Sequence, residues 1–166
     1  AHQLPEVATL FFGDSVSTAQ VLDLARDARA EGLANARDCL ALTPASKALE
    51  KVAKDLRLAV GIDAGRFSHP QLQEKAEFAP ALQALEEEIA SFAALLETQA
   101  ARAEGLEKCW QRALELQQRL AQWQNPVEPG YVRWAEAFTQ SLQLNATPLD
   151  VANIFRKQMG GHPRAW

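Results

Sequence analysis

The chain has 166 residues, 48% of them hydrophobic, which is enough for one globular domain with its own core and excludes a disordered protein. Asp and Glu outnumber Lys and Arg by 21 to 17, so the overall charge does not favour nucleic acid and any such contact must be local. Cys39 and Cys109 lie far apart without a CxxC pair, which predicts no disulfide framework, no metal cluster and a reducing cytoplasmic setting. No apolar run approaches the ~20 residues of a membrane span and no signal-peptide pattern is visible, so neither is expected.

Helix signals dominate the first part of the chain. Ser17 suits an N-cap, and the apolar spacing after it predicts a helix to about Leu33, although whether this helix continues further stays open. Thr43 and Pro44 predict the N-cap and first residue of a second helix. We expect Gly61 to be the left-handed residue that ends it, before a loop with the sequence IDAGRFSHP.

A persistent apolar pattern runs from Pro80 to about Gln124. Its spacings of three and four are typical of a heptad seam. The seam comprises Leu82, Leu85, Ile89, Phe92, Leu96, Gln99, Ala103, Leu106, Trp110, Ala113, Gln117 and Leu120. An unbroken helix of this length would extend roughly 65 Å, too long for a compact core of this size. Gly is unfavourable inside a helix, so we predict a kink or turn at Gly105 between two antiparallel halves of a long helical arm.

The hydrophobic period changes after the sequence NPVEPG. Alternation of apolar with polar or small residues predicts two short antiparallel strands. Their apolar faces are expected to carry Val132, Trp134 and Phe138, and Leu142, Leu144 and Ala146. Thr147, Pro148 and Asp150 then predict a capped helix that ends near Gly160. The expected fold class is mainly α, a helical domain with a long arm that is straight or kinked, plus a short β-hairpin and a terminal helix.

Motifs of nucleotide hydrolysis and metal chemistry are missing from the sequence. There is no G-x-x-x-x-G-K-[ST], HExxH, G-x-S-x-G or GxGxxG, and His2, His69 and His162 lie in unrelated contexts. We therefore expect no catalytic residue, no metal site and no ATP hydrolysis by this chain alone.

A local basic strip is the clearest candidate for binding phosphate groups. Lys47, Lys51, Lys54 and Arg57 follow one another at spacings of four, three and three. A solvated helix face without a ligand is the alternative, since such charge patterns are common. Weaker candidates for DNA contact are Arg26, Arg29 and Arg37, together with Arg112, Arg119 and Trp123. Trp110 and Trp134 are expected to pack in the core, whereas Trp123 lies off the seam and could stack on a base.

The two ends of the chain resemble one family. AHQLPEVA resembles the end of the DEAH box of DinG/XPD-like superfamily 2 DNA helicases, with Ala1 and His2 as its last letters, and SLQLNATPLDVANIFRKQMGGHPRAW resembles the segment leading into the next helicase motif. The resemblance covers the whole chain and extends to the YoaA branch of the family. It implies a piece of a longer helicase, with a motor-domain stub at 1–14, the helical Arch domain at 15–125 and a returning motor-domain stub at 126–166.

The resemblance also implies a function. The parent would hydrolyse ATP with Mg²⁺, carry a 4Fe–4S cluster and move 5′ to 3′ along single-stranded DNA in repair or replication, and the Arch would help to enclose or guide that strand beside the remaining helicase domains. His2 would lack the Asp and Glu that handle magnesium. The clamp-loader chi subunit of the replicative polymerase is implied as a partner, with no site identified in these residues. The alternative is a protein-interaction or architectural module that contacts no DNA.

Overall fold

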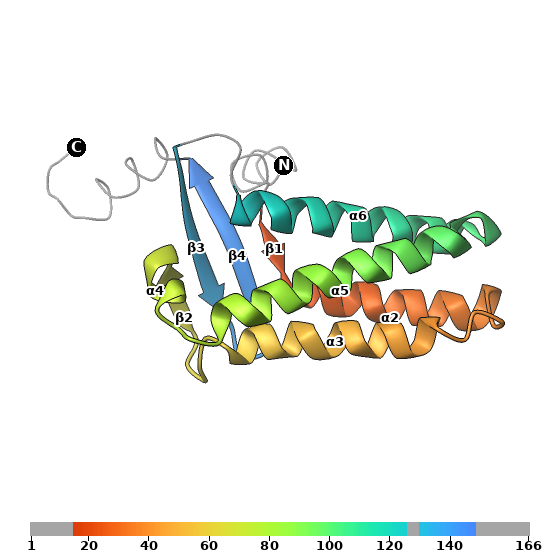
Figure 1. The fold of residues 1–166 in the computed structure, drawn as a ribbon, viewed down its shortest axis with the longest axis horizontal. Coiled ribbons are helices and arrows are strands. Elements are labelled where there is room, and N and C mark those ends of the chain that lie inside the picture. Colours follow the sequence, from red (N-terminus) through yellow and green to blue (C-terminus); the bar gives the residue numbers. More distant parts are fainter. Residues whose placement is uncertain (1–14, 126–129, 149–166) are drawn as a thin grey trace, which may run out of the picture.

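The computed structural model describes residues 15–125 and 130–148, which form a bundle of long helices with a small antiparallel sheet at one end (Figure 1). The elements are β1 (Val16–Ser17), α2 (Thr18–Asn35), α3 (Leu42–Leu58), β2 (Gly65–Ser68), α4 (His69–Gln73), α5 (Phe78–Gln99), the 3-10 turn η1 (Ala100–Arg102), α6 (Glu104–Gln124), β3 (Tyr131–Ala137) and β4 (Leu142–Pro148). The predicted fold class, mainly α with a short antiparallel hairpin, is confirmed.

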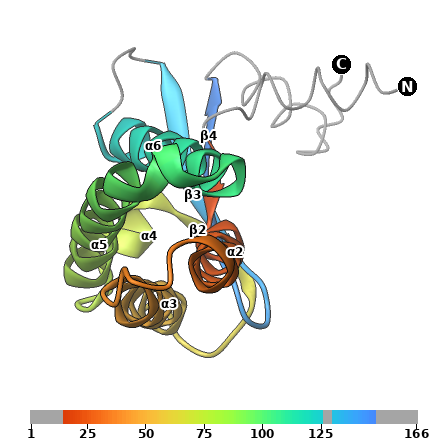
Figure 2. The ribbon, with the colours of Figure 1, turned by 90° about the vertical axis from the view of Figure 1, so that its right-hand side faces the viewer.

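The four long helices pack in a ring. The helix α2 contacts α3 and α6, and α5 also contacts α3 and α6, so each helix has two neighbours, as the view along the bundle shows (Figure 2). Apolar side chains from all four helices and from the sheet join in one core cluster. Within the described ranges, 15–125 and 130–148, no helix is long and apolar enough to cross a membrane.

The start of α2 is confirmed. Ser17 Oγ accepts from the Ala19 backbone N–H at 3.0 Å, and Gln20 Oε1 accepts from the Ser17 N–H at 3.0 Å, which completes a capping box. The helix ends at Asn35, so it does not continue into the following segment. Gly32 lies where Leu42 of α3 packs closely on α2, and a Cβ at Gly32 would collide with that leucine.

The predicted start of α3 is wrong by two residues. The helix begins at Leu42, its N-cap is Ala41, and no side chain caps it. The first turn of a helix has N–H groups without helical partners, so Pro44 is tolerated inside that turn as well as at its first position. The buried Leu42 extends the helix backwards into the core. Gly61, with φ of +99°, has the predicted left-handed conformation.

The antiparallel helical hairpin is confirmed, but its turn does not lie at Gly105. The reversal takes place through η1 and the extended Ala103, and Gly105 lies in the first turn of α6. A Cβ at Gly105 would meet the carboxylate of Glu31 on α2, the end of a flexible side chain that can move aside. The seam is buried along α5, whereas on α6 the buried stripe shifts to Leu106, Cys109, Ala113, Leu116, Leu120 and Trp123.

The sheet has the order β1-β4-β3-β2, and every neighbouring pair is antiparallel. The β3–β4 hairpin was predicted, but the edge strands β1 and β2 were not, and β2 and α4 form in the segment expected to be a loop. The β3–β4 hairpin, which lies in the segment 126–166, thus forms one sheet with β1 and β2 from the segment 15–125. Thr147 and Pro148 end β4. The predicted helix after them, the segment 1–14 and His2 lie outside the described residues.

The inward face of β3 is not the predicted one. Ala135 and Ala137 are buried opposite Leu144 and Leu142, whereas Trp134 is half-buried and Phe138 lies beyond the strand end. Cross-strand partners lie on the same face of a sheet, so pairing with the buried Leu144 and Leu142 turns Ala135 and Ala137 toward the core. The predicted inward face of β4 is confirmed by Leu142, Leu144 and Ala146.

Candidate nucleic-acid interface

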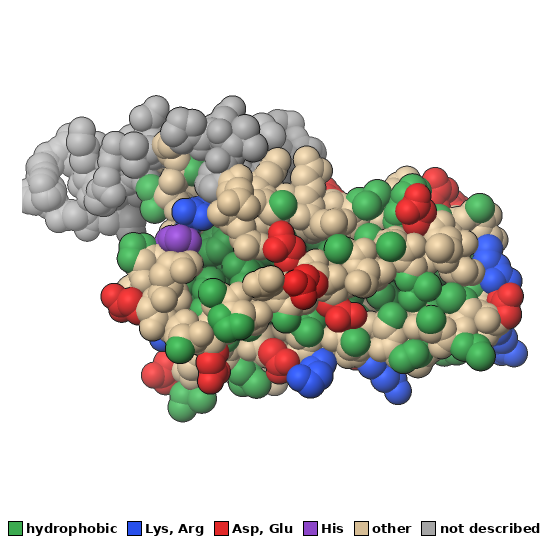
Figure 3. Space-filling model, in the orientation of Figure 1, with side chains coloured by type: hydrophobic (Ala, Val, Ile, Leu, Met, Phe, Trp, Pro, Cys, Tyr) green, Lys and Arg blue, Asp and Glu red, His purple; other side chains and the backbone are tan. Residues whose placement is uncertain are grey.

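Three of the four residues in the predicted basic strip are exposed on one side of α3. Lys47, Lys51 and Lys54 are separated along the helix axis by about 6 Å and about 4.5 Å, from the rise of 1.5 Å per residue. Lys51 pairs with Asp55 at 2.9 Å, and neither Lys47 nor Lys54 forms an ion pair with a described residue. Basic side chains lie along the edge that α3 forms, while acidic side chains cross the face over α5 (Figure 3). We call these three residues the α3 lysine strip.

Arg57 does not lie on that strip, contrary to the prediction. Its side chain is buried, Nε donates to the Phe138 carbonyl at 2.7 Å, and Nη1 and Nη2 donate to the carbonyls of Gly61 and Ile62 at 2.6 and 3.4 Å. Charge spacing alone could not reveal these partners, because Phe138 is far away in the sequence. Arg57 therefore ties the end of α3 to the turn of the β3–β4 hairpin.

Replacing Arg57 by Met should lower the free energy of unfolding by about 2–4 kcal/mol, since the carbonyls of Phe138 and Gly61 would lose charge-assisted hydrogen bonds. Urea denaturation followed by circular dichroism measures this loss. Lys54→Met, at an exposed position three residues earlier, is the matched control and should change the midpoint little. Equal midpoints for the two variants would contradict the structural role of Arg57.

The predicted arginines on α2 are already engaged within the chain. Arg26 pairs with Asp23 at 2.8 Å, and Arg29 pairs with Glu50 of α3 at 3.0 Å. The Nε of Arg37 donates at 3.0 Å to a backbone carbonyl in the last turns of α2. Arg29 is half-buried and links two helices, so it is poorly placed for a phosphate contact.

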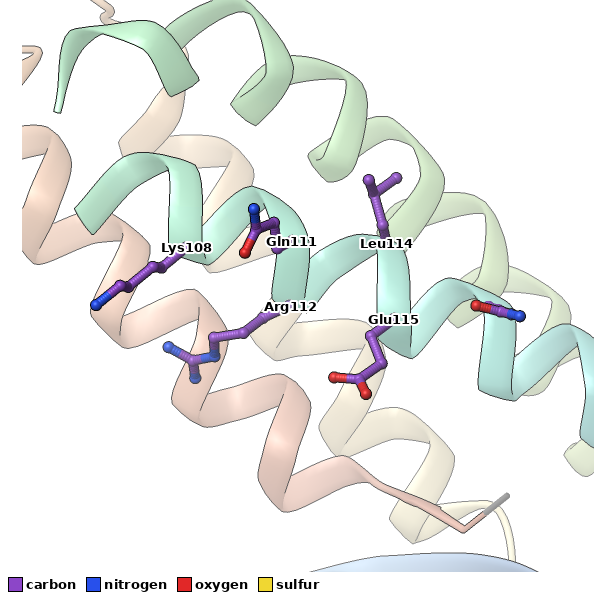
Figure 4. A pocket seen from close by; sticks show the side chains of 6 residues that line it. Lys108, Gln111, Arg112, Leu114 and Glu115 are labelled. Carbon is purple, nitrogen blue, oxygen red and sulfur yellow. The ribbon is translucent and has the colours of Figure 1, made fainter. Parts of the chain in front are cut away.

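The predicted arginines on α6 also have acidic partners. Arg112 pairs with Asp27 of α2, and Arg119 pairs with Glu115, each at 2.9 Å. An open depression runs along this part of α6 (Figure 4), and it is lined by Lys108, Gln111, Arg112, Leu114, Glu115 and Gln118. Cations, a carboxylate and an apolar side chain alternate there, so the depression has no uniform charge that would select a phosphate.

Trp123 is a core residue, and its prediction as an exposed stacking candidate is wrong. Its side chain is 1% exposed, and its Nε1 donates to the Asn145 carbonyl at 2.7 Å. The ring meets Phe78 and His69 edge-on, with centroids 6.3 and 5.6 Å apart. Helical spacing could have indicated that Trp123 is buried, because it follows Leu120 of the buried seam by three residues. Trp110 and Trp134, both expected in the core, are half-buried, and Trp110 packs against the core cluster.

The surroundings of His69, Cys109 and Asp38 shift the pKa values of these three described residues. Burial, together with the Arg133 guanidinium, lowers the pKa of His69, and burial raises the pKa of the Cys109 thiol. The hydrogen bond from Arg102 lowers the pKa of the exposed Asp38 carboxyl. In the part of the chain that the structure describes, no three His, Cys, Asp or Glu side chains gather as metal ligands.

Three exposed apolar side chains near the end of the α3 lysine strip were not predicted from the sequence as candidate binding residues. Leu58 is 65% exposed, Ile62 90% and Phe138 44%. Leu58 follows Lys54 by four residues, a helical spacing that the sequence shows, whereas Ile62 lies beyond the end of α3 and the left-handed Gly61. Phe138 could not be placed beside them from the sequence, because it comes from the distant hairpin. We call these three residues the Phe138 patch.

No protein-family model matches the chain, and no solved structure matches it. The ATP-dependent DNA helicase YoaA of Escherichia coli is 30% identical over 166 residues, which are 100% of this chain and 26% of that helicase. The ATP-dependent DNA helicase YoaA of Haemophilus influenzae is 28% identical over 167 residues, again 100% of this chain and 26% of the relative. The chain spans about a quarter of the length of these curated relatives. Over its whole length, it is homologous to part of the YoaA ATP-dependent DNA helicases, in agreement with the resemblance of its two ends.

Proposed function

We propose that the chain is the non-catalytic Arch module of a DinG/XPD-like DNA helicase and that it guides single-stranded DNA along the α3 lysine strip. The observation that carries this proposal is the exposure of Lys47, Lys51 and Lys54 on one helix side, where Lys51 pairs with Asp55 and neither Lys47 nor Lys54 forms an ion pair with a described residue. Homology to YoaA helicases supports the helicase context.

The positions of β1 and β4 support a module inserted into a larger domain. Val16 of β1 pairs with Leu144 of β4, and the two strands are antiparallel, so the chain enters and leaves the sheet on adjacent strands. An insertion with neighbouring ends needs only one attachment site on its host. In the proposed helicase, the segments that flank this sheet, 1–14 and 149–166, would continue into the motor domain, and His2 would belong to its DEAH box.

The remaining activities of the proposed parent would come from segments outside this chain. ATP and Mg²⁺ would bind to the motor domains, a 4Fe–4S cluster would lie upstream, and the clamp-loader chi subunit would bind elsewhere on the helicase. The Arch itself would contribute phosphate contacts. Lysine ammonium groups bind phosphates without reading sequence, so we expect weak, sequence-tolerant and salt-dependent binding.

The alternative function, recruitment of another chain through the heptad seam, has less support. Leu82, Leu85, Ile89, Phe92 and Leu96 of the seam are buried in the chain's own core. These side chains hold the bundle together and offer no surface to a partner.

The test uses the variant with Lys47, Lys51 and Lys54 changed to Gln. Fluorescence anisotropy of a labelled single-stranded oligonucleotide, titrated at several salt concentrations, measures its affinity. Each single-strand phosphate contact contributes about 0.7 to the slope of log K against log salt, so the variant should lose about 2 units of slope and bind more weakly at low salt.

A matched control separates the effect of losing a local phosphate contact from the effect of losing net positive charge. Changing the exposed Arg26, Arg37 and Lys108 to Gln removes the same number of positive charges from other surfaces. This control should keep most of the slope. Equal losses in both variants, or no binding of the oligonucleotide by the unmodified chain at low salt, would refute guidance of DNA by the α3 lysine strip.

A further inference from the structure

The Phe138 patch is a preformed surface made by two separate elements. Leu58 and Ile62 lie at and beyond the end of α3, and Phe138 follows β3. Single exposed apolar side chains are ordinary on protein surfaces, but here the hairpin turn that carries Phe138 is tied to the end of α3. The guanidinium of Arg57 binds the carbonyls of Phe138 and Ile62 together. The backbone that carries Ile62 and Phe138 is therefore held in place in the free chain.

The patch continues directly from the α3 lysine strip. Lys54 and Leu58 are four residues apart, hence neighbours on one side of the helix. Nearby Asp55 is paired with Lys51, so its charge is balanced locally. Positive charges followed by an apolar, aromatic surface match the chemistry of a single strand, which presents phosphates and unpaired bases. We propose that unpaired bases stack on the Phe138 patch while the flanking phosphates contact the lysine strip, an inference that rests on the proposed function.

Phe138 is the stacking residue in this arrangement. Its backbone N–H donates to the Ser141 carbonyl at 2.8 Å, and its own carbonyl accepts from Arg57 at 2.7 Å, so both backbone groups are held. The ring is nevertheless 44% exposed. Because the backbone is held, only the two side-chain torsions of the ring have to be ordered when a base stacks on it. A paired base within a duplex cannot offer its face, so the patch selects single strands.

The experiment compares Phe138→Ala with the unmodified chain. Two labelled probes are titrated by anisotropy, an oligothymidylate and a strand of equal length and charge in which abasic sites replace the bases. Phe138→Ala should bind the oligothymidylate about tenfold more weakly, the loss expected for one base–aromatic stack, and the abasic strand equally well. Phe138→Trp should restore binding of the oligothymidylate.

Leu114→Ala is the matched control, because Leu114 is 42% exposed on α6, a helix that does not carry the patch. It should bind both probes like the unmodified chain. Melting curves of Phe138→Ala should overlay those of the unmodified chain, since the ring is exposed and the hydrogen bonds at residue 138 involve only the backbone.

The outcomes distinguish this inference from the proposed function. If the lysine variant weakens both probes but Phe138→Ala weakens neither, guidance by the α3 lysine strip stands and base stacking is refuted. If neither probe binds to the unmodified chain, both proposals fail. If Phe138→Ala abolishes self-association in sedimentation velocity and leaves oligothymidylate affinity unchanged, the patch binds a second copy of the chain and the inference is overturned.

Discussion

Replacing Leu96 by Asp is expected to unfold most of the helical bundle. Leu96 lies near the end of α5, is 0% exposed and belongs to the common core. Removing a buried leucine costs about 2–5 kcal/mol, and burying a carboxylate without a partner adds to that cost. The total approaches the stability of a typical domain, about 5–15 kcal/mol. Thermal and urea unfolding followed by circular dichroism at 222 nm measure the effect.

The control for this variant is Leu114→Asp. Leu114 is exposed on α6, so an aspartate there remains in water and should alter the melting temperature little. Both substitutions replace Leu by Asp in a helix, so the difference between their melting temperatures measures the effect of burial alone. Unchanged helicity and melting in Leu96→Asp would show that the seam of α5 does not form the core.

Replacing Trp123 by Ala should lower the free energy of unfolding by about 3–5 kcal/mol. The indole lies between the end of the bundle and the sheet, where it contacts Phe78 and His69 and donates a hydrogen bond to the Asn145 carbonyl. Its loss would leave a large cavity and a buried carbonyl without this donor. Urea denaturation measures the loss, and Trp110→Ala, at a half-buried position of the same helix, should cost less.

Trp123→Phe separates the structural role of Trp123 from a role in DNA binding. The phenyl ring fills most of the space, so the variant should fold and lose only part of its stability. Its oligonucleotide affinity should equal that of the unmodified chain, because the side chain of Trp123 is 1% exposed and no base can reach it. A loss of affinity comparable to that of the lysine variant would contradict the core assignment.

The long helices and the family could be predicted because their signals are local or repeated. Ser17 caps α2 through atoms within three residues, and the periodicity after it identifies the buried face. The α5–α6 hairpin follows from the length of the seam, since one straight helix would leave the core. Exposure of Lys47, Lys51 and Lys54 also follows from helical period, because the same period buries Leu49 and Leu56 on the other side.

The sequence by itself thus determined the helical class, the positions of the long helices to within a few residues, the β3–β4 hairpin and three residues of the candidate interface. Only the tertiary structure decided the short strand β2, the burial of Arg57, the hydrogen bond from Trp123 to the sheet, and the position of Phe138 beside the end of α3. The physical reason is shared by all of them. Backbone pairing with β3 forms β2, carbonyls of distant residues hold Arg57, and the sheet covers Trp123, so each depends on partners that sequence spacing does not specify.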